Sequence, residues 1–136
     1  MRQRSLLKKG DRLPAVLAGT DKPSSAGEQI EFAEFCALQK LHSASARFYR
    51  DAFAADPRLA ERVDARYQAA CAAALAGTGQ GKDVDKLDDN ERASWRRQAL
   101  DWLKADLALW GKRAAKDEAK AREALWYELK HWQTAG

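Results

Sequence analysis

The stretch from Ala76 to Asp83, AGTGQGKD, has residue types found in phosphate-binding loops. Such a loop follows the pattern G-x-x-x-x-G-K-[ST], in which backbone N–H groups and a lysine surround the phosphates and a hydroxyl holds Mg²⁺. Gly81 and Lys82 fit, but Ala76 stands where the first glycine is required and Asp83 where the hydroxyl is required. The residues before the loop are alanine-rich, which predicts a helix instead of the strand that should precede it. We therefore predict a glycine-rich turn and no nucleotide cofactor.

The chain offers few groups for nucleophilic or acid–base catalysis. Its two histidines are His42, in a predicted turn, and His131, near the C-terminus, and no motif pairs either one with a nucleophile. Cys36 and Cys71 lie in apolar, alanine-rich surroundings without metal-ligand spacing, as is typical of small buried residues. The sequence predicts no enzyme activity and no catalytic residue.

An acidic run, Asp83, Asp85, Asp88 and Asp89, could in principle collect a divalent cation. Its spacing departs from the D-x-[DN]-x-[DN]-G pattern of calcium loops. Asp88 and Glu91 have the spacing of a helix-capping box, so capping accounts for part of this charge. We predict no metal site.

Composition favours one helical domain. The chain has 136 residues, 46% hydrophobic and 32% charged, and valine and isoleucine, which strands usually recruit, are rare. The net charge of +4 is spread among many carboxylates, which argues against a nucleic-acid-binding surface. The basic start is followed only by the short apolar segment LPAVLA, which predicts neither a signal peptide nor a membrane span. We expect a cytoplasmic protein.

Periodicity and capping signals predict an N-terminal arm and five helices. Residues 1–25 are expected to be irregular, with Leu13, Val16 and Leu17 docking on the core. The capping box Ser25–Glu28 predicts a helix from Ala26. Further helices are predicted at about 43–55, 58–76, 89–113 and 115–133.

Tryptophans mark the last two predicted helices. Trp95, Trp102 and Trp110 share the apolar side of the fourth helix, which predicts that they belong to the core. Trp126 and Trp132 cannot both be buried by the narrow apolar side of the fifth helix, so one of them is a candidate residue for self-association or for docking of a further module. The charged remaining faces of this helix suit an end-capping helix that stabilises the domain.

The first predicted helix pair carries an ordered set of large and small residues: Phe32-Ala33, Ser45, Tyr49, Ala52 and Pro57. This spacing resembles a tetratricopeptide repeat. The second pair fits more loosely through Tyr67, Ala69-Ala70, Gly77, Ala99 and Leu103, with a glycine- and aspartate-rich insertion in place of the tight turn. More widely, the pieces 13–19, 33–36, 52–57, 67–83 and 87–110 resemble tetratricopeptide segments that follow serine/threonine kinase or β-propeller modules in planctomycete proteins.

This resemblance implies an all-α fold, a tetratricopeptide-like array of about two antiparallel helix pairs with a C-terminal capping helix. After the arm of residues 1–25, the helical domain spans 26–136. It divides into repeat 1 at 26–59, repeat 2 at 60–113 with a loop insertion at 78–89, and the capping helix at 114–136.

The resemblance also implies a function, protein–protein interaction through a concave groove between the first helices of each pair. The implied groove residues are Ile30, Glu34, Ala37, Leu38, Tyr67, Cys71, Ala74 and Leu75. The expected partner is a protein or peptide, with homo-oligomerisation as a further option. Two alternatives stay open: a structural spacer or self-assembly unit without a ligand, and a basic helical module that contacts nucleic acid through residues such as Arg96 and Arg97.

Overall fold

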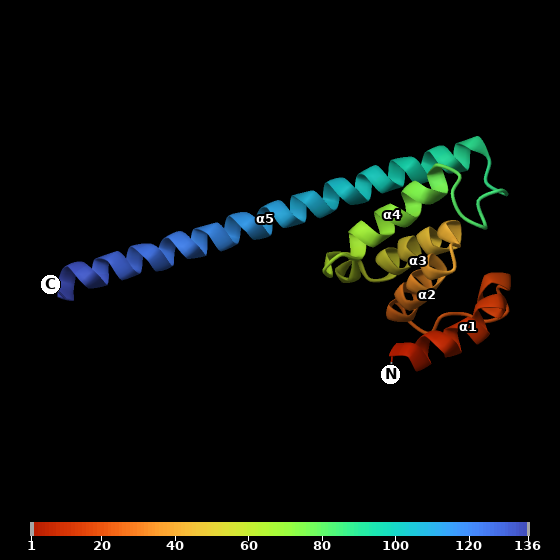
Figure 1. The fold of residues 1–136 in the computed structure, drawn as a ribbon, viewed down its shortest axis with the longest axis horizontal. Helices are drawn as coiled ribbons and strands as arrows, with labels where there is room; N and C mark the ends of the chain where they lie inside the picture. Colours follow the sequence, from red (N-terminus) through yellow and green to blue (C-terminus); the bar gives the residue numbers. More distant parts are fainter. Residues whose placement is uncertain (1, 136) are drawn as a thin grey trace.

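The computed structural model is all-helical over the residues it describes, which are the backbone of residues 2–135 and the side chains of residues 10–127 and 130 (Figure 1). The element order is α1 (Arg2–Ala18), α2 (Ala26–Leu38), α3 (His42–Ala55), the 3₁₀ helix η1 (Pro57–Glu61), α4 (Ala65–Gly77) and α5 (Asp89–Ala135). The all-α prediction is confirmed, whereas the finer arrangement differs from the predicted one at three places.

Both predicted capping boxes begin helices. Ser25 Oγ accepts a hydrogen bond of 3.1 Å from the Glu28 N–H at the start of α2. At the start of α5, Asp88 Oδ1 accepts a bond of 2.7 Å from the Glu91 N–H. These bonds satisfy N–H groups that have no partner within the helix, which is why both helices begin at the predicted residues.

The core forms where α2 packs on α3, α3 on α4 and α4 on α5. Small residues allow α2 and α3 to pack closely. Ala33 of α2 and Ser45 of α3 are fully buried, and the Ser45 hydroxyl donates a 2.7 Å hydrogen bond to the Ala33 carbonyl. The alanine run of α4 lies between its two neighbours, and the residues buried there are Ala69, Ala70, Ala72, Ala73 and Ala76. The order of packing therefore follows the order of the chain.

Aromatic side chains fill the space between α3 and α5. The rings of Phe53 and Trp102 meet edge to face with centroids 5.7 Å apart, and the Arg50 guanidinium lies over the Trp95 ring. Trp95 and Trp102 are buried as predicted, whereas Trp110 is 44% exposed and lies at the edge of the bundle. Trp132 lies outside the described side chains.

The first correction concerns residues 1–25, which were predicted to be an irregular arm. Residues 2–18 form the helix α1. Leu13 and Val16 are buried against Phe32 and Cys36, as the docking prediction required, but Leu17 remains exposed. The sequence of residues 1–25 is rich in proline, glycine and serine, which predicts irregular backbone. A Cβ on Gly10 would lie only 3.2 Å from the Phe35 ring, so glycine there allows α1 to pack closely against α2.

The third predicted helix is also different, since it begins at Ala65 and not near residue 58. Asp56 caps the short helix η1 by accepting a hydrogen bond from the Arg58 N–H, with Pro57 as the first residue. Asp64 then adopts a left-handed backbone conformation with φ of 64°, which an α-helix cannot contain. This turn sets the position at which α4 starts.

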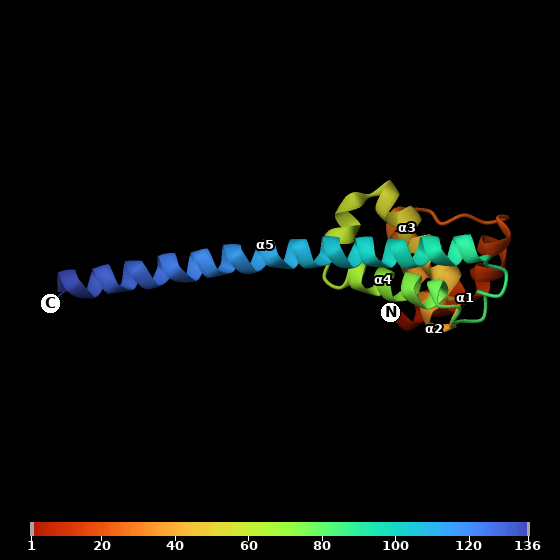
Figure 2. The same ribbon diagram turned by 90° about the horizontal axis from the view of Figure 1, so that it is seen from above.

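The third correction concerns the two helices predicted at 89–113 and 115–133, which are one continuous helix, α5. Figures 1 and 2 show that α5 runs along the bundle and then continues well beyond it. Every described side chain from Ala114 to Tyr127 is exposed, so this part does not cap the domain. A single glycine, Gly111, costs about 1 kcal/mol in a helix, which the surrounding alanine, lysine, arginine and glutamate residues offset.

Candidate functional site

A cavity of about 540 Å³ lies between α2 and the turn that joins η1 to α4. The buried side chains of Ile30 and Tyr49 form the floor of the cavity. Leu38 and Val63 lie at its edges, with 69% and 70% of their surface exposed. The complete lining is Ile30, Glu34, Ala37, Leu38, Tyr49, Arg62, Val63, Asp64, Ala65 and Gln68. The site thus combines an apolar floor with charged groups at its edge.

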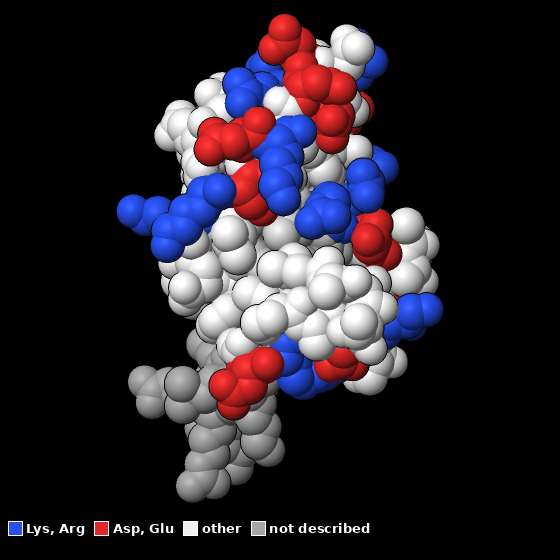
Figure 3. Space-filling view, turned by 90° about the vertical axis from the view of Figure 1, so that its right-hand side faces the viewer, with Lys and Arg blue, Asp and Glu red and all other residues white. Residues whose placement is uncertain are grey.

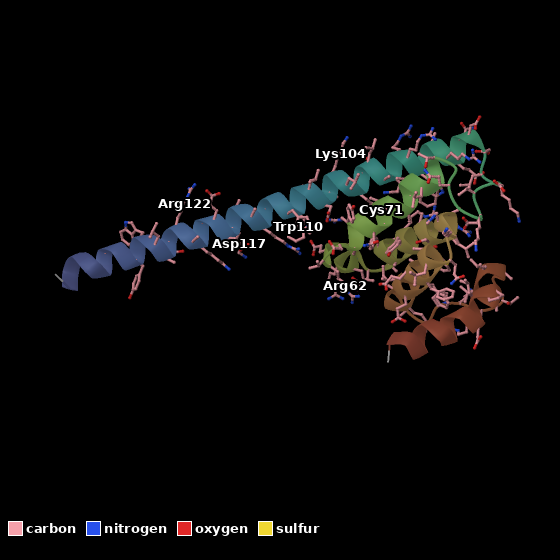
Figure 4. All side chains as sticks on the ribbon, in the orientation of Figure 1. Arg62, Cys71, Lys104, Trp110, Asp117 and Arg122 are labelled. Atoms are coloured by element: carbon pink, nitrogen blue, oxygen red, sulfur yellow. The ribbon has the colours of Figure 1, made fainter. Side chains whose placement is uncertain are left out.

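The η1–α4 turn is held in place by contacts with α5. Arg113 donates a 2.9 Å hydrogen bond to the Glu61 carbonyl, and Arg66 donates one of 3.4 Å to the Ala105 carbonyl. These bonds fix the turn on which Arg62, Val63 and Asp64 stand, and Arg62 projects from it into solvent (Figure 4). Because a rigid frame lowers the entropy lost on binding, this arrangement suits recognition.

The electrostatics of the cavity favour an uncharged floor. Burial, reinforced by the negative charge of Glu34, raises the pKa of Tyr49, so its hydroxyl stays neutral at physiological pH. Glu34 and Asp64 contribute negative charge to the lining and Arg62 contributes positive charge. This lining can cover an apolar side chain and orient polar groups that flank it.

The structure brings together half of the predicted groove residues. Ile30, Glu34, Ala37 and Leu38, all on α2, line the cavity as a group. The four residues predicted from the second repeat, Tyr67, Cys71, Ala74 and Leu75, lie on α4 outside this cavity. Tyr67 is half exposed, and the other three are partly buried.

Sequence reasoning missed the other part of the lining. The sequence predicts a helix over about 58–76, which places Arg62, Val63 and Asp64 inside a helix and outside the predicted groove. Pro57 signals the start of η1 in the sequence, but the left-handed turn at Asp64 has no comparably strong local signal.

The glycine-rich stretch is a structural brace for α3. The Asp83 carboxylate accepts hydrogen bonds of 3.0 Å from the Ser43 N–H and 2.8 Å from the Ala44 N–H, the first turn of α3. Gly81, with φ of 123°, lies so close to the Lys40 carbonyl that a Cβ would be only 2.9 Å from that oxygen. The acidic residue that departs from the phosphate-loop pattern therefore satisfies the N-terminus of a helix.

The remaining candidates for catalysis or metal binding are the two cysteines and the histidine near the C-terminus. Cys36 is a buried free thiol, and burial, together with the charge of Asp83, raises its pKa to about 12, so it is a poor nucleophile. Cys71 is also a free cysteine. No group of three or more potential metal ligands occurs among the described residues, and His131 lies outside the described side chains.

Two of the described basic residues, Arg92 and Arg96, have structural partners. Arg96 donates a 2.6 Å hydrogen bond to the Gly77 carbonyl, and Arg92 donates one of 3.2 Å to the Val84 carbonyl, so both close the loop before α5. Figure 3 shows acidic and basic side chains interspersed around an uncharged area on the end of the bundle. Charges of both signs therefore alternate on this face of the described residues.

Comparison of the chain with protein-family models, with curated proteins and with solved structures finds no match. Within the described part of the chain, none of the helices combines the length and the apolar character needed to cross a membrane.

Proposed function

We propose that this protein is a protein–protein interaction module that binds a peptide segment of a partner in the cavity between α2 and the η1–α4 turn. The observation that carries this proposal is the exposure of Leu38 and Val63 at the two edges of one cavity. A bound apolar side chain would remove both from water, and burial of apolar surface contributes roughly 25 cal/mol per Å².

We propose further that α2–α5 form two tetratricopeptide-like helix pairs, α2 with α3 and α4 with α5. Packing between consecutive helices supports this arrangement, as does complete burial of Ala33, Ser45 and Ala52 at the small-residue positions of the motif. In such an array, α2 and α4 would share one concave face. The groove would then extend from the cavity towards Tyr67.

The test is a selection of peptides from a random display library on the immobilised full chain, followed by fluorescence anisotropy with the selected peptides. We expect Leu38→Glu and Val63→Glu each to weaken binding at least about tenfold, which corresponds to about 1.4 kcal/mol. Trp126→Glu, which makes a similar change at an exposed site on α5, is the control and should leave affinity unchanged.

The outcomes separate the two proposals. Equal affinity of wild type, Leu38→Glu and Val63→Glu would contradict binding in the cavity. Weaker binding by Tyr67→Glu as well would support the extended groove of a tetratricopeptide-like array. Unchanged affinity of Tyr67→Glu would restrict the site to the cavity and contradict that extended groove.

A further inference from the structure

One face of α5 carries eight residues at alternating intervals of four and three: Leu100, Lys104, Leu107, Gly111, Ala114, Glu118, Ala121 and Leu125. We call this set the seam. Such spacing is that of helices that pair along their length. All eight residues are exposed, including Leu100 at 57%, Leu107 at 71% and Leu125 at 62%. At 1.5 Å per residue, the seam is about 38 Å long.

The seam is distinct from the side of α5 that packs on the bundle. Trp95, Ala99 and Trp102 define the buried side. At 100° per residue, Leu107 and Leu125 point in the same direction, about 140° from that of Trp102. The seam begins beside the bundle and continues along the projecting part of the helix, so the chain itself leaves it uncovered.

Gly111 lies near the middle of the seam, and the monomer gives no reason for a glycine there. A Cβ at this position would meet nothing within 4 Å. Glycine costs about 1 kcal/mol relative to alanine in a helix interior, and no close approach within the described chain explains it. Gly111 and the neighbouring Ala114 would let a second helix approach α5 closely.

The charges of the seam identify that second helix. Lys104 and Glu118 lie seven residues before and seven residues after Gly111. In a parallel pair of identical chains, each of them would face its own copy and repel it. In an antiparallel pair centred at Gly111, Lys104 lies opposite the second copy's Glu118, and Leu100 lies within one helical turn of the second copy's Leu125 at both ends.

Two charged residues beside the seam also match when the two helices are antiparallel. Asp101 and Arg122 are both exposed and lie on one side of the seam, and antiparallel pairing places each beside the other in the second copy. Figure 4 shows Lys104 and Arg122 projecting from the same side of α5, while Trp110 and Asp117 project from the other. Arg122 already donates a 2.7 Å hydrogen bond to Glu118, so both side chains are oriented near the seam.

We infer that two copies of this chain associate through an antiparallel pair of α5 helices, with the twofold axis near Gly111. Each projecting segment then packs along the bundle-anchored half of the other α5. The interface is self-complementary, as twofold symmetry requires, because a cation on one side of the axis faces an anion from the other. The surface is separate from the cavity of the proposed function.

Sedimentation velocity of the full chain over a wide range of concentrations tests this inference. We expect wild type to dimerise. Lys104→Glu and Glu118→Lys should each weaken the dimer by about tenfold or more, because each places like charges together twice per dimer. The double variant Lys104→Glu/Glu118→Lys should restore affinity to near the wild-type value, and Lys116→Glu, on the opposite side of α5, is the matched control.

Gly111→Leu separates loss of pairing from loss of folding. Leucine should block the close approach and weaken the dimer, while the helicity measured by circular dichroism is retained or rises. A wild type that stays monomeric at every concentration would overturn the inference. So would a dimer whose affinity is unchanged by Gly111→Leu and by both single charge reversals, which would indicate another surface or a parallel pair.

Discussion

The two halves of α5 are held by different forces. Residues 89–113 lie along the bundle, where Trp95 and Trp102 are buried and Arg96 and Arg113 bind carbonyl groups of other segments. The described side chains of 114–127 are exposed, and the ion pair that holds Arg122 is with Glu118, one turn away in the same helix. Tertiary packing therefore stabilises the anchored half, while local propensity stabilises the projecting half.

This difference shows what each kind of sequence signal predicts. Alanine, lysine, arginine and glutamate are strong helix formers, and a segment rich in them stays helical without a partner more readily than most. The helical spacing of apolar residues does not indicate whether the surface that they pack against belongs to the same chain. Trp102 and Leu107 both belong to α5, yet one is buried and the other is 71% exposed.

The largest expected contrast between the halves comes from tryptophan truncation. Trp102→Ala should lower the free energy of unfolding by about 3–5 kcal/mol, because it leaves a cavity against Phe53. Trp126→Ala, at a 62% exposed position, should change it by less than about 0.5 kcal/mol. Urea unfolding followed by circular dichroism measures both, and equal losses would show that the projecting half is packed in solution.

A smaller contrast is expected for arginine truncation. Arg96→Ala removes the donor that satisfies the Gly77 carbonyl at the end of α4, and we expect a loss of about 1 kcal/mol. Arg122→Ala removes an exposed ion pair within one helix, which is worth less than about 0.5 kcal/mol. The same urea experiment tests the order, and a greater loss for Arg122→Ala would contradict it.

Local signals predicted the elements better than they predicted their connections. The capping boxes at Ser25 and Asp88 gave the correct starts of α2 and α5, because each depends on residues within one turn. The proline, glycine and serine content of residues 1–25 predicted an irregular arm, although the packing of Gly10 against Phe35 makes a helix there favourable. The predicted break between the helices at 89–113 and 115–133 is likewise replaced by one continuous helix.

The candidate site shows the same limit. The α2 part of the cavity could be predicted because its residues share one side of a helix with clear periodicity. The η1–α4 part could not, since it depends on the left-handed turn at Asp64 and on bonds from α5. The role of Asp83 could not be predicted from its neighbours either, because it caps α3 from a position 40 residues further along the chain than Ser43.

Deleting residues 115–136 should also have little effect on the stability of the bundle. Had these residues formed the predicted capping helix, their deletion would expose part of the core and lower the melting temperature markedly. The described side chains of this segment are exposed, so we expect the melting temperature to change by less than about 4 °C, the shift that a loss of about 1 kcal/mol would cause.

The full-length and truncated proteins should be compared with both carrying Gly111→Leu, so that loss of the dimer cannot contribute to the difference. Helical circular dichroism should fall there with the number of residues removed, while the unfolding transition stays in place. A large drop in melting temperature in that background would mean that the segment stabilises the bundle directly, and would remove the distinction between the two halves of α5.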